Sequence, residues 1–173
     1  ISGDVVFTKG NLNLYCQEGR QYEIDGLAIL YNEVSAVQED MNLTCDTIKF
    51  YSKDDQLLSV GSSHVWDDDY DLMADTITVF TDIDSGIANG NVTLVQKGQI
   101  INANRIEYKK DKSQDGVSYK AIGDVIIQDS SRVATCGLAK YDRENERTIL
   151  ELEPEIKENN RLLAGTKITL AYE

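Results

Sequence analysis

The sequence predicts an all-β protein in which one sheet is folded over along a crease and built from about six repeated units of two strands. Three observations predict this fold. Apolar and polar residues alternate along runs such as 76–80 and 92–96, and clusters of Gly, Asn, Asp and Ser separate the runs. In addition, a pair of short motifs recurs along the chain. The apolar period of 3.6 residues that indicates helices is almost absent.

A tripeptide of Gly, Asp or Asn, and Val begins each repeated unit. Clear copies occupy residues 3–5, 90–92 and 123–125, and weaker echoes begin at residues 26, 61 and 153. The starts are about 30 residues apart on average. This spacing predicts a chain that extends by adding similar units to one sheet.

A second motif follows in each unit: aliphatic, any, small, Asp or Asn, any, aliphatic, any, large. Clear copies begin at Leu43, Leu72, Ile101 and Leu163, and those near residues 14 and 133 are degenerate. The apolar positions change parity at the Asp or Asn, and such a one-residue slip turns the following side chains to the opposite face of a strand. The motif therefore predicts a bulge or bend there, and two walls that meet along a crease.

Length, composition and charge narrow the class of protein. A chain of 173 residues suits a single domain over residues 1–173, and an apolar share of 41% is enough for a core. The longest uncharged stretches, such as 26–32, are far shorter than the roughly 20 apolar residues that cross a bilayer. The net charge of −13 repels phosphate backbones, so the sequence predicts no nucleic-acid partner.

Residues that could carry catalysis or bind a metal are few. His64 is the single histidine and we expect it to be structural or solvent-facing, with no Ser-His-Asp or Cys-His set. The aspartates of 67–71 lack the Gly and closing Glu of an EF-hand loop. We interpret 67–71 as a solvated turn or strand rim and expect no enzyme, metal or cofactor. Cys16 and Cys45 fit the small position of the second motif, and Cys136 fits it in one of two registers. This favours buried thiols, and a Cys16–Cys45 disulfide is the alternative.

The two motifs together resemble the OstA family, the bacterial lipopolysaccharide transport proteins of the LptA type, with LptC and the N-terminal part of LptD. The best match runs from 90 to 96 and continues from 101 to 108. The resemblance implies a periplasmic protein, its signal peptide removed, with an open, slightly twisted β-jellyroll whose walls diverge around an apolar trough. In the family the trough holds acyl chains of lipopolysaccharide.

The resemblance also implies partners. Family modules join end to end through edge strands, so LptC-like proteins, LptD-like proteins or a second copy would dock here. An unpaired edge strand is a template for another strand. Residues 4–8 and 167–172 are the expected edges.

The lipid-binding residues are expected on the inner faces of the two walls. If the walls stay apart, their inward side chains leave an apolar strip facing a groove, which usually marks a binding surface. The predicted groove residues are the inward apolar positions of the units: Val5, Phe7, Leu14, Leu43, Ile48, Phe50, Leu72, Ile77, Val79, Val92, Leu94, Ile101, Ile106, Val125, Ile127, Leu163, Ile168 and Leu170.

Two other classes of protein remain open from the sequence. A carbohydrate-active β-repeat protein would also be rich in aspartate, but it needs two carboxylates roughly 5 to 10 Å apart, and no pair is fixed by the sequence. A purely structural solenoid without a ligand would show the same repeats.

Overall fold

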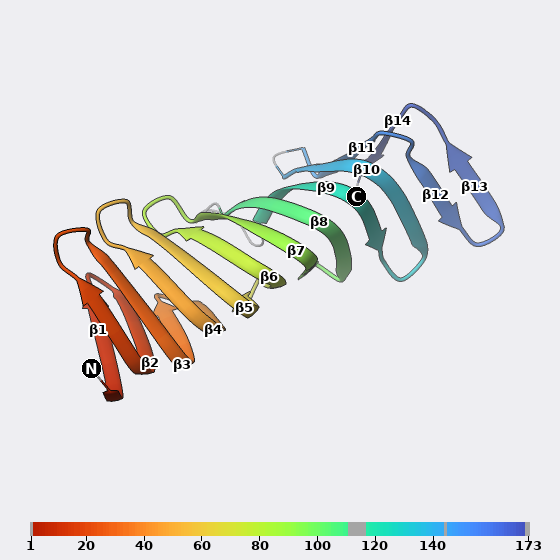
Figure 1. The fold of residues 1–173 in the computed structure, drawn as a ribbon. Coiled ribbons are helices and arrows are strands. Elements are labelled where there is room, and N and C mark those ends of the chain that lie inside the picture. Colours follow the sequence, from red (N-terminus) through yellow and green to blue (C-terminus); the bar gives the residue numbers. More distant parts are fainter. Residues whose placement is uncertain (1, 111–116, 144, 172–173) are drawn as a thin grey trace.

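The computed structural model describes residues 2–110, 117–143 and 145–171, and the regular structure in these residues is entirely β-strand (Figure 1). The all-β prediction is confirmed. Within the same residues, no helix exists that is long and apolar enough to span a membrane. The strands are β1 (Ser2–Lys9), β2 (Leu12–Tyr22), β3 (Leu27–Gln38), β4 (Met41–Tyr51), β5 (Gln56–Trp66), β6 (Tyr70–Phe80), β7 (Ser85–Gln96), β8 (Gln99–Lys110), β9 (Val117–Gln128), β10 (Arg132–Asp142), β11 (Arg147–Glu151), β12 (Glu155–Glu158), β13 (Arg161–Ala164) and β14 (Lys167–Ala171).

The described strands form one 14-stranded sheet that runs from β1 at one end to a fork at the other, where one branch ends at β14 and the other, through β12, at β13 (Figure 1). From β1 to β11 each strand pairs antiparallel with its sequence neighbours, and β14 pairs with β11. The sheet forks at β10, because residues 132–135 pair with β12 whereas residues 138–142 pair with β11. One wall of the folded sheet, which contains residues 132–135, therefore ends at β13. The other wall, which contains residues 138–142, ends at β14.

The predicted bend lies in the middle of a strand, as β6 illustrates. Leu72 and Ala74 are buried before Asp75, and Ile77 and Val79 are buried after it. The register of pairing with β7 shifts at the same place. Strands β4 and β8 show the same change of parity. The second motif is therefore a crease motif, as the sequence predicted.

The tripeptide motif, which was expected to begin each repeated unit, lies inside a strand and forms the facing half of the crease. Gly90 and Asn91 lie inside β7 with positive φ values of 77° and 47°. Asn91 Nδ2 donates to Oδ1 and Oδ2 of Asp75 at 3.2 and 3.0 Å, and a Cβ on Gly90 would lie 2.2 Å from Asp75 Oδ2. Gly123 faces Asn104 in the same way. Two predicted short strands are thus one long strand that bends.

The bend brings opposite ends of the strands together. We call the margin formed by the hairpins β1–β2, β3–β4, β5–β6 and β7–β8 the first rim, and the margin where β2 meets β3, β4 meets β5, β6 meets β7 and β8 meets β9 the second rim. An 11-residue strand spans about 36 Å when straight. Yet Lys110 Nζ at the second rim lies 2.5 Å from Asp67 Oδ2 at the first rim. The sheet is therefore folded over onto itself.

The cysteines lie inside this fold beside the crease. Cys16, Cys45 and Cys136 are all buried and all free, so the structure contains no Cys16–Cys45 disulfide. Burial raises the pKa of the Cys45 thiol to about 12, and it also raises the pKa values of the other two thiols. The expectation of buried small residues is confirmed.

Candidate functional site

The predicted groove residues lie in the interior between the two walls, with three exceptions. Phe7 and Leu170 are only partly buried and pack against the core, and Leu163 is 56% exposed. Leu163 is outside the interior because β13 is the last strand of its wall, so no further strand covers it. The others are at most 8% exposed: Val5, Leu14, Leu43, Ile48, Phe50, Leu72, Ile77, Val79, Val92, Leu94, Ile101, Ile106, Val125, Ile127 and Ile168.

The interior is packed rather than open along its length, which departs from the expectation of diverging walls. Leu43, Ile77, Leu94 and Ile106 have no solvent-exposed surface. The physical reason is that inward Leu and Ile side chains of facing walls meet once the rims touch, and apolar surface that can be buried leaves water. An apolar guest must therefore separate the walls or enter at an end.

A cavity of about 340 Å³ opens into the interior at the β1 end. Its apolar lining includes Phe7, Leu14 and Phe50, which were predicted as groove residues, and Leu12 and Leu27, which were not. The sequence could have indicated Leu12, because it has the same parity as Leu14 in the run that precedes the crease of β2. Polar residues such as Lys9, Gln21 and Ser52 also border the cavity. This end of the interior therefore combines an apolar lining with a polar border.

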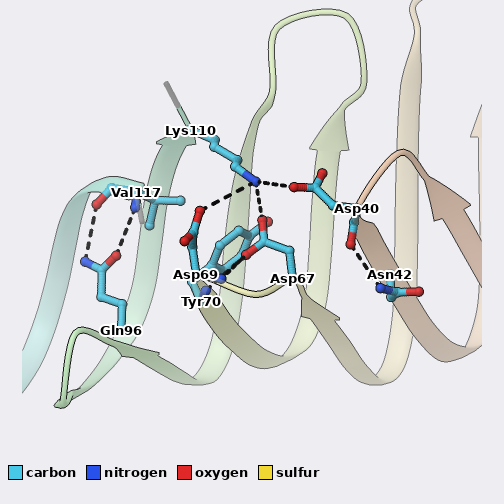
Figure 2. A network of polar contacts seen from close by, with 8 residues as sticks. All are labelled: Asp40, Asn42, Asp67, Asp69, Tyr70, Gln96, Lys110 and Val117. Atoms are coloured by element: carbon cyan, nitrogen blue, oxygen red, sulfur yellow. Dashed lines mark hydrogen bonds and ion pairs between the residues drawn. The ribbon is translucent and has the colours of Figure 1, made fainter. Parts of the chain in front are cut away.

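We call the line along which the first and second rims meet the mouth of the folded sheet. A polar network closes this mouth near the middle of the molecule (Figure 2). Lys110 Nζ lies 2.5 Å from Asp67 Oδ2, 3.0 Å from Asp40 Oδ2 and 3.9 Å from Asp69 Oδ2. The Asp67 side chain is only 1% exposed. Burial alone would lower the pKa of Lys110, but the hydrogen bonds and charges of Asp67 and Asp40 outweigh it and raise that pKa. Lys110 is therefore held as a cation across the mouth.

Three further contacts join the first rim to the second, and together with the Lys110 network we call them the latches. Lys9 Nζ donates to the Ser52 carbonyl and lies 2.6 Å from Asp55 Oδ1. Gln38 Nε2 donates to the carbonyl oxygen of Thr81 at 3.3 Å.

The fourth latch is a reciprocal pair of hydrogen bonds, also visible in Figure 2. Gln96 Nε2 donates to the Val117 carbonyl at 3.2 Å, and the Val117 N–H donates to Gln96 Oε1 at 2.9 Å. Gln96 is buried, so both amide groups are satisfied out of contact with water. Sequence reasoning did not find any latch, because the partners come from strands that are not neighbours.

The residues considered for catalysis or metal binding, His64 and the aspartates of 67–71, contact neighbouring groups of the fold. His64 Nε2 lies 3.0 Å from Asp71 Oδ1, and its ring stacks on Trp66 with centroids 4.4 Å apart. Asp67 Oδ1 accepts hydrogen bonds from the N–H groups of Asp69 and Tyr70 at 2.7 and 3.1 Å. Residues 67–69 thus form the turn that leads into β6, but the Asp67 side chain is buried and paired rather than solvated as expected. Across the described ranges, no group of three or more His, Cys, Asp or Glu could hold a metal ion.

The two ends of the sheet differ in what they expose. At the start, β1 pairs with no described strand except β2, so its other side is a free edge among the described strands. At the far end, β13 and β14 are both edges, and the fork leaves Leu152, Leu162 and Leu163 more than half exposed. The expected edges at 4–8 and 167–171 are edge strands in the structure, and residue 172 lies outside the described residues.

Comparisons with known proteins agree with this architecture. The family described as LptA/(LptD N-terminal domain) LPS transport protein matches residues 74–173. A crystal structure of LptH from Pseudomonas aeruginosa, described as the LptA homologous periplasmic component of the conserved lipopolysaccharide transport device, superposes with a TM-score of 0.55 at 17% identity. The match covers 61% of this chain and 79% of that chain. The comparison with curated proteins gave no match.

Proposed function

The chain belongs to the family of LptA and LptD N-terminal domain lipopolysaccharide transport proteins, and from this premise we propose that it binds lipopolysaccharide in the periplasm. The acyl chains enter the apolar interior between the walls, and the polar head group stays in water at the mouth. The cavity at the β1 end is the observation that carries this proposal, because it joins apolar lining residues to a polar border. A long apolar chain matches such a site.

The energetics favour acyl chains as the ligand. Burying one methylene gains about 0.8 kcal/mol, so a 12-carbon chain gains on the order of 10 kcal/mol gross. The net gain is much smaller, because the lipid leaves a micelle or another protein and the walls must separate. A small net gain at each step suits a carrier that hands its ligand on. The net charge of −13 is tolerated because the anionic head group remains solvated.

The edges of the sheet support docking to other transport components. β1 at one end and β13 and β14 at the other can each accept a strand, and the two ends have different surfaces. Contacts between unlike ends do not close on themselves, so they build chains of modules. LptC-like proteins, LptD-like proteins and a second copy are the proposed partners, and Leu162 and Leu163 would be covered on docking.

A matched pair of substitutions tests the lipid site. Phe7 lines the cavity, whereas Val6 in the same strand points outward and is 56% exposed. We expect Phe7→Glu to weaken binding of a fluorescent acyl probe by about tenfold or more, because a charge at the cavity must be desolvated. Val6→Glu should leave the affinity unchanged. Equal affinities of both variants would contradict the site.

Mass spectrometry of lipid extracts of the purified protein, together with a hydrolysis assay, distinguishes a lipid transporter from a carbohydrate-active protein and from a structural solenoid. Extracted acyl chains support transport. Hydrolysis of an oligosaccharide without bound lipid would favour the carbohydrate-active class, and the absence of both would favour a scaffold.

A further inference from the structure

Three of the latches repeat with the same geometry. Lys9 and Ser52, Gln38 and Thr81, and Asp67 and Lys110 are each 43 residues apart in sequence. In each case a hairpin of the first rim contacts a turn of the second rim that lies three strands further along the sheet. The contacts therefore run diagonally across the mouth and recur from one unit to the next, as the twist of the sheet requires.

The latches are polar contacts between described residues that hold the rims together. No backbone ladder pairs the two rims, since the described strands pair only along the sheet and at its fork. At the opposite side, every long strand continues through the crease, where paired residues of positive φ such as Gly90 and Asn91 provide the bend. Separation of the rims would thus keep the hydrogen bonds of the sheet and break the latches and the apolar contacts behind them.

We propose that the latches form a gate that opens sideways about the crease and controls when the interior admits a guest. The Lys110 network is the central element, because Asp67 is almost fully buried and one ammonium group joins two hairpins of the first rim, at Asp40 and Asp67. Identifying the guest as an acyl chain rests on the proposed function. The opening motion itself does not.

The buried thiols provide a ligand-free measurement of opening. Cys45 lies in β4, within the part of the sheet that the latches of Lys9, Gln38 and Lys110 span. Cys136 lies in β10, further along the sheet than the fourth latch. Both are at most 9% exposed, so a small methanethiosulfonate reagent reaches them only after an opening event. The two labelling rates, resolved by mass spectrometry of peptides, separate local opening from global unfolding.

We expect Gln38→Leu to speed labelling of Cys45 by about tenfold, which corresponds to about 1.4 kcal/mol in the opening equilibrium, and Lys110→Met to speed it by about thirtyfold or more. Labelling of Cys136 should stay within twofold. Lys140→Met is the matched control, because Lys140 pairs with Glu151 at 3.2 Å on the neighbouring strand of the same wall and spans no mouth. Equal acceleration of Cys45 and Cys136, or no acceleration in Gln38→Leu, would overturn the gate.

A cross-link tests whether opening limits loading. Gln38→Cys and Thr81→Cys are joined by a short bis-maleimide in a chain carrying Cys16→Ala, Cys45→Ala and Cys136→Ala, substitutions that put Ala where Ala74 and Ala103 stand in other units. Cross-linking should slow uptake of a fluorescent acyl probe at least tenfold, compared with the same chain carrying two separate maleimide caps. Equal uptake rates would overturn the gate. If the unmodified protein takes up no probe, the proposed function fails, and the thiol measurement alone decides the gate.

Discussion

Replacing Gly90 with Ala measures how much the crease contributes to stability. The added Cβ would lie 2.2 Å from Asp75 Oδ2 and 3.0 Å from Asp75 Cβ, so rotation of the carboxylate alone does not remove the overlap. Gly98 provides the control, because its φ of 74° is close to the 77° of Gly90 and a Cβ there meets nothing within 4 Å. The difference between the two substitutions therefore isolates the contact between the crease strands.

The expected loss in the free energy of unfolding has two parts, the backbone cost at positive φ and the disturbed contact with Asp75. An L-residue at positive φ costs about 1–2 kcal/mol, offset by about 0.4–1 kcal/mol from the smaller entropy of the unfolded chain. Gly98→Ala should therefore lower the free energy of unfolding by about 1 kcal/mol. Gly90→Ala also disturbs the hydrogen bonds between Asn91 and Asp75, which are exposed and so contribute modestly. We expect a loss of about 2–3 kcal/mol, or a fall in Tm of about 4–12 °C.

Urea unfolding followed by circular dichroism provides the measurement, with equal m-values as the condition for comparing variants. The double variant Asp75→Ala, Gly90→Ala should recover part of the loss, since the overlap with the carboxylate is gone while the backbone cost remains. The reasoning would be refuted if Gly90→Ala were no more destabilising than Gly98→Ala, or if removal of the Asp75 side chain recovered nothing.

Three further outcomes are expected. Burial tends to raise the pKa of Asp129, but hydrogen bonds from the Ser131 and Arg132 backbones and the Arg132 side chain outweigh it and lower that pKa to about 2. A carboxylate with a depressed pKa stabilises the folded protein at pH values above its unfolded pKa. The free energy of unfolding should therefore fall by about 2 kcal/mol as the pH falls from about 4 to 2. Asp129→Asn should flatten this loss in acid titrations of stability, and an unchanged slope would contradict the assignment. Lys110→Met should cost about 2–4 kcal/mol in urea unfolding because Asp67 is left buried without its partner, and Lys110→Met with Asp67→Asn should recover much of it. Thiol titration should find three reactive groups in denaturant and slow reaction in the native protein, since Cys16, Cys45 and Cys136 are buried and free. A single reactive group in denaturant would indicate a disulfide.

The bend of β6 was predictable from sequence, whereas its partner in β7 was not, and the reason is periodicity. Across Asp75 the buried positions change from even to odd numbers, so the alternation itself shows a break. In β7, Ala88 and Val92 are buried on both sides of Gly90 with unchanged parity, because two residues of positive φ are accommodated together. The alternation there is unbroken, and the tripeptide therefore looked like the start of a repeated unit.

The closed mouth was not predictable for a different reason. Three of the four latches join residues 43 positions apart, a separation set by the twist of a bent sheet rather than by the repeat of about 30 residues. Local alternation fixes which side chains face inward, such as Leu43 and Ile106, but not how closely the walls approach. Leu163 fits the crease motif and was assigned to the interior for that reason. Its position in the last strand of a wall decides its exposure.

The diagonal course of the latches sets a minimum size for an autonomous fragment of this protein. A piece that holds one pair of strands contains the inward face of its core but no residue 43 positions away to fasten across it. Excised pieces should therefore stay unfolded until they include about five consecutive strands, beyond which added strands should increase stability in nearly equal increments.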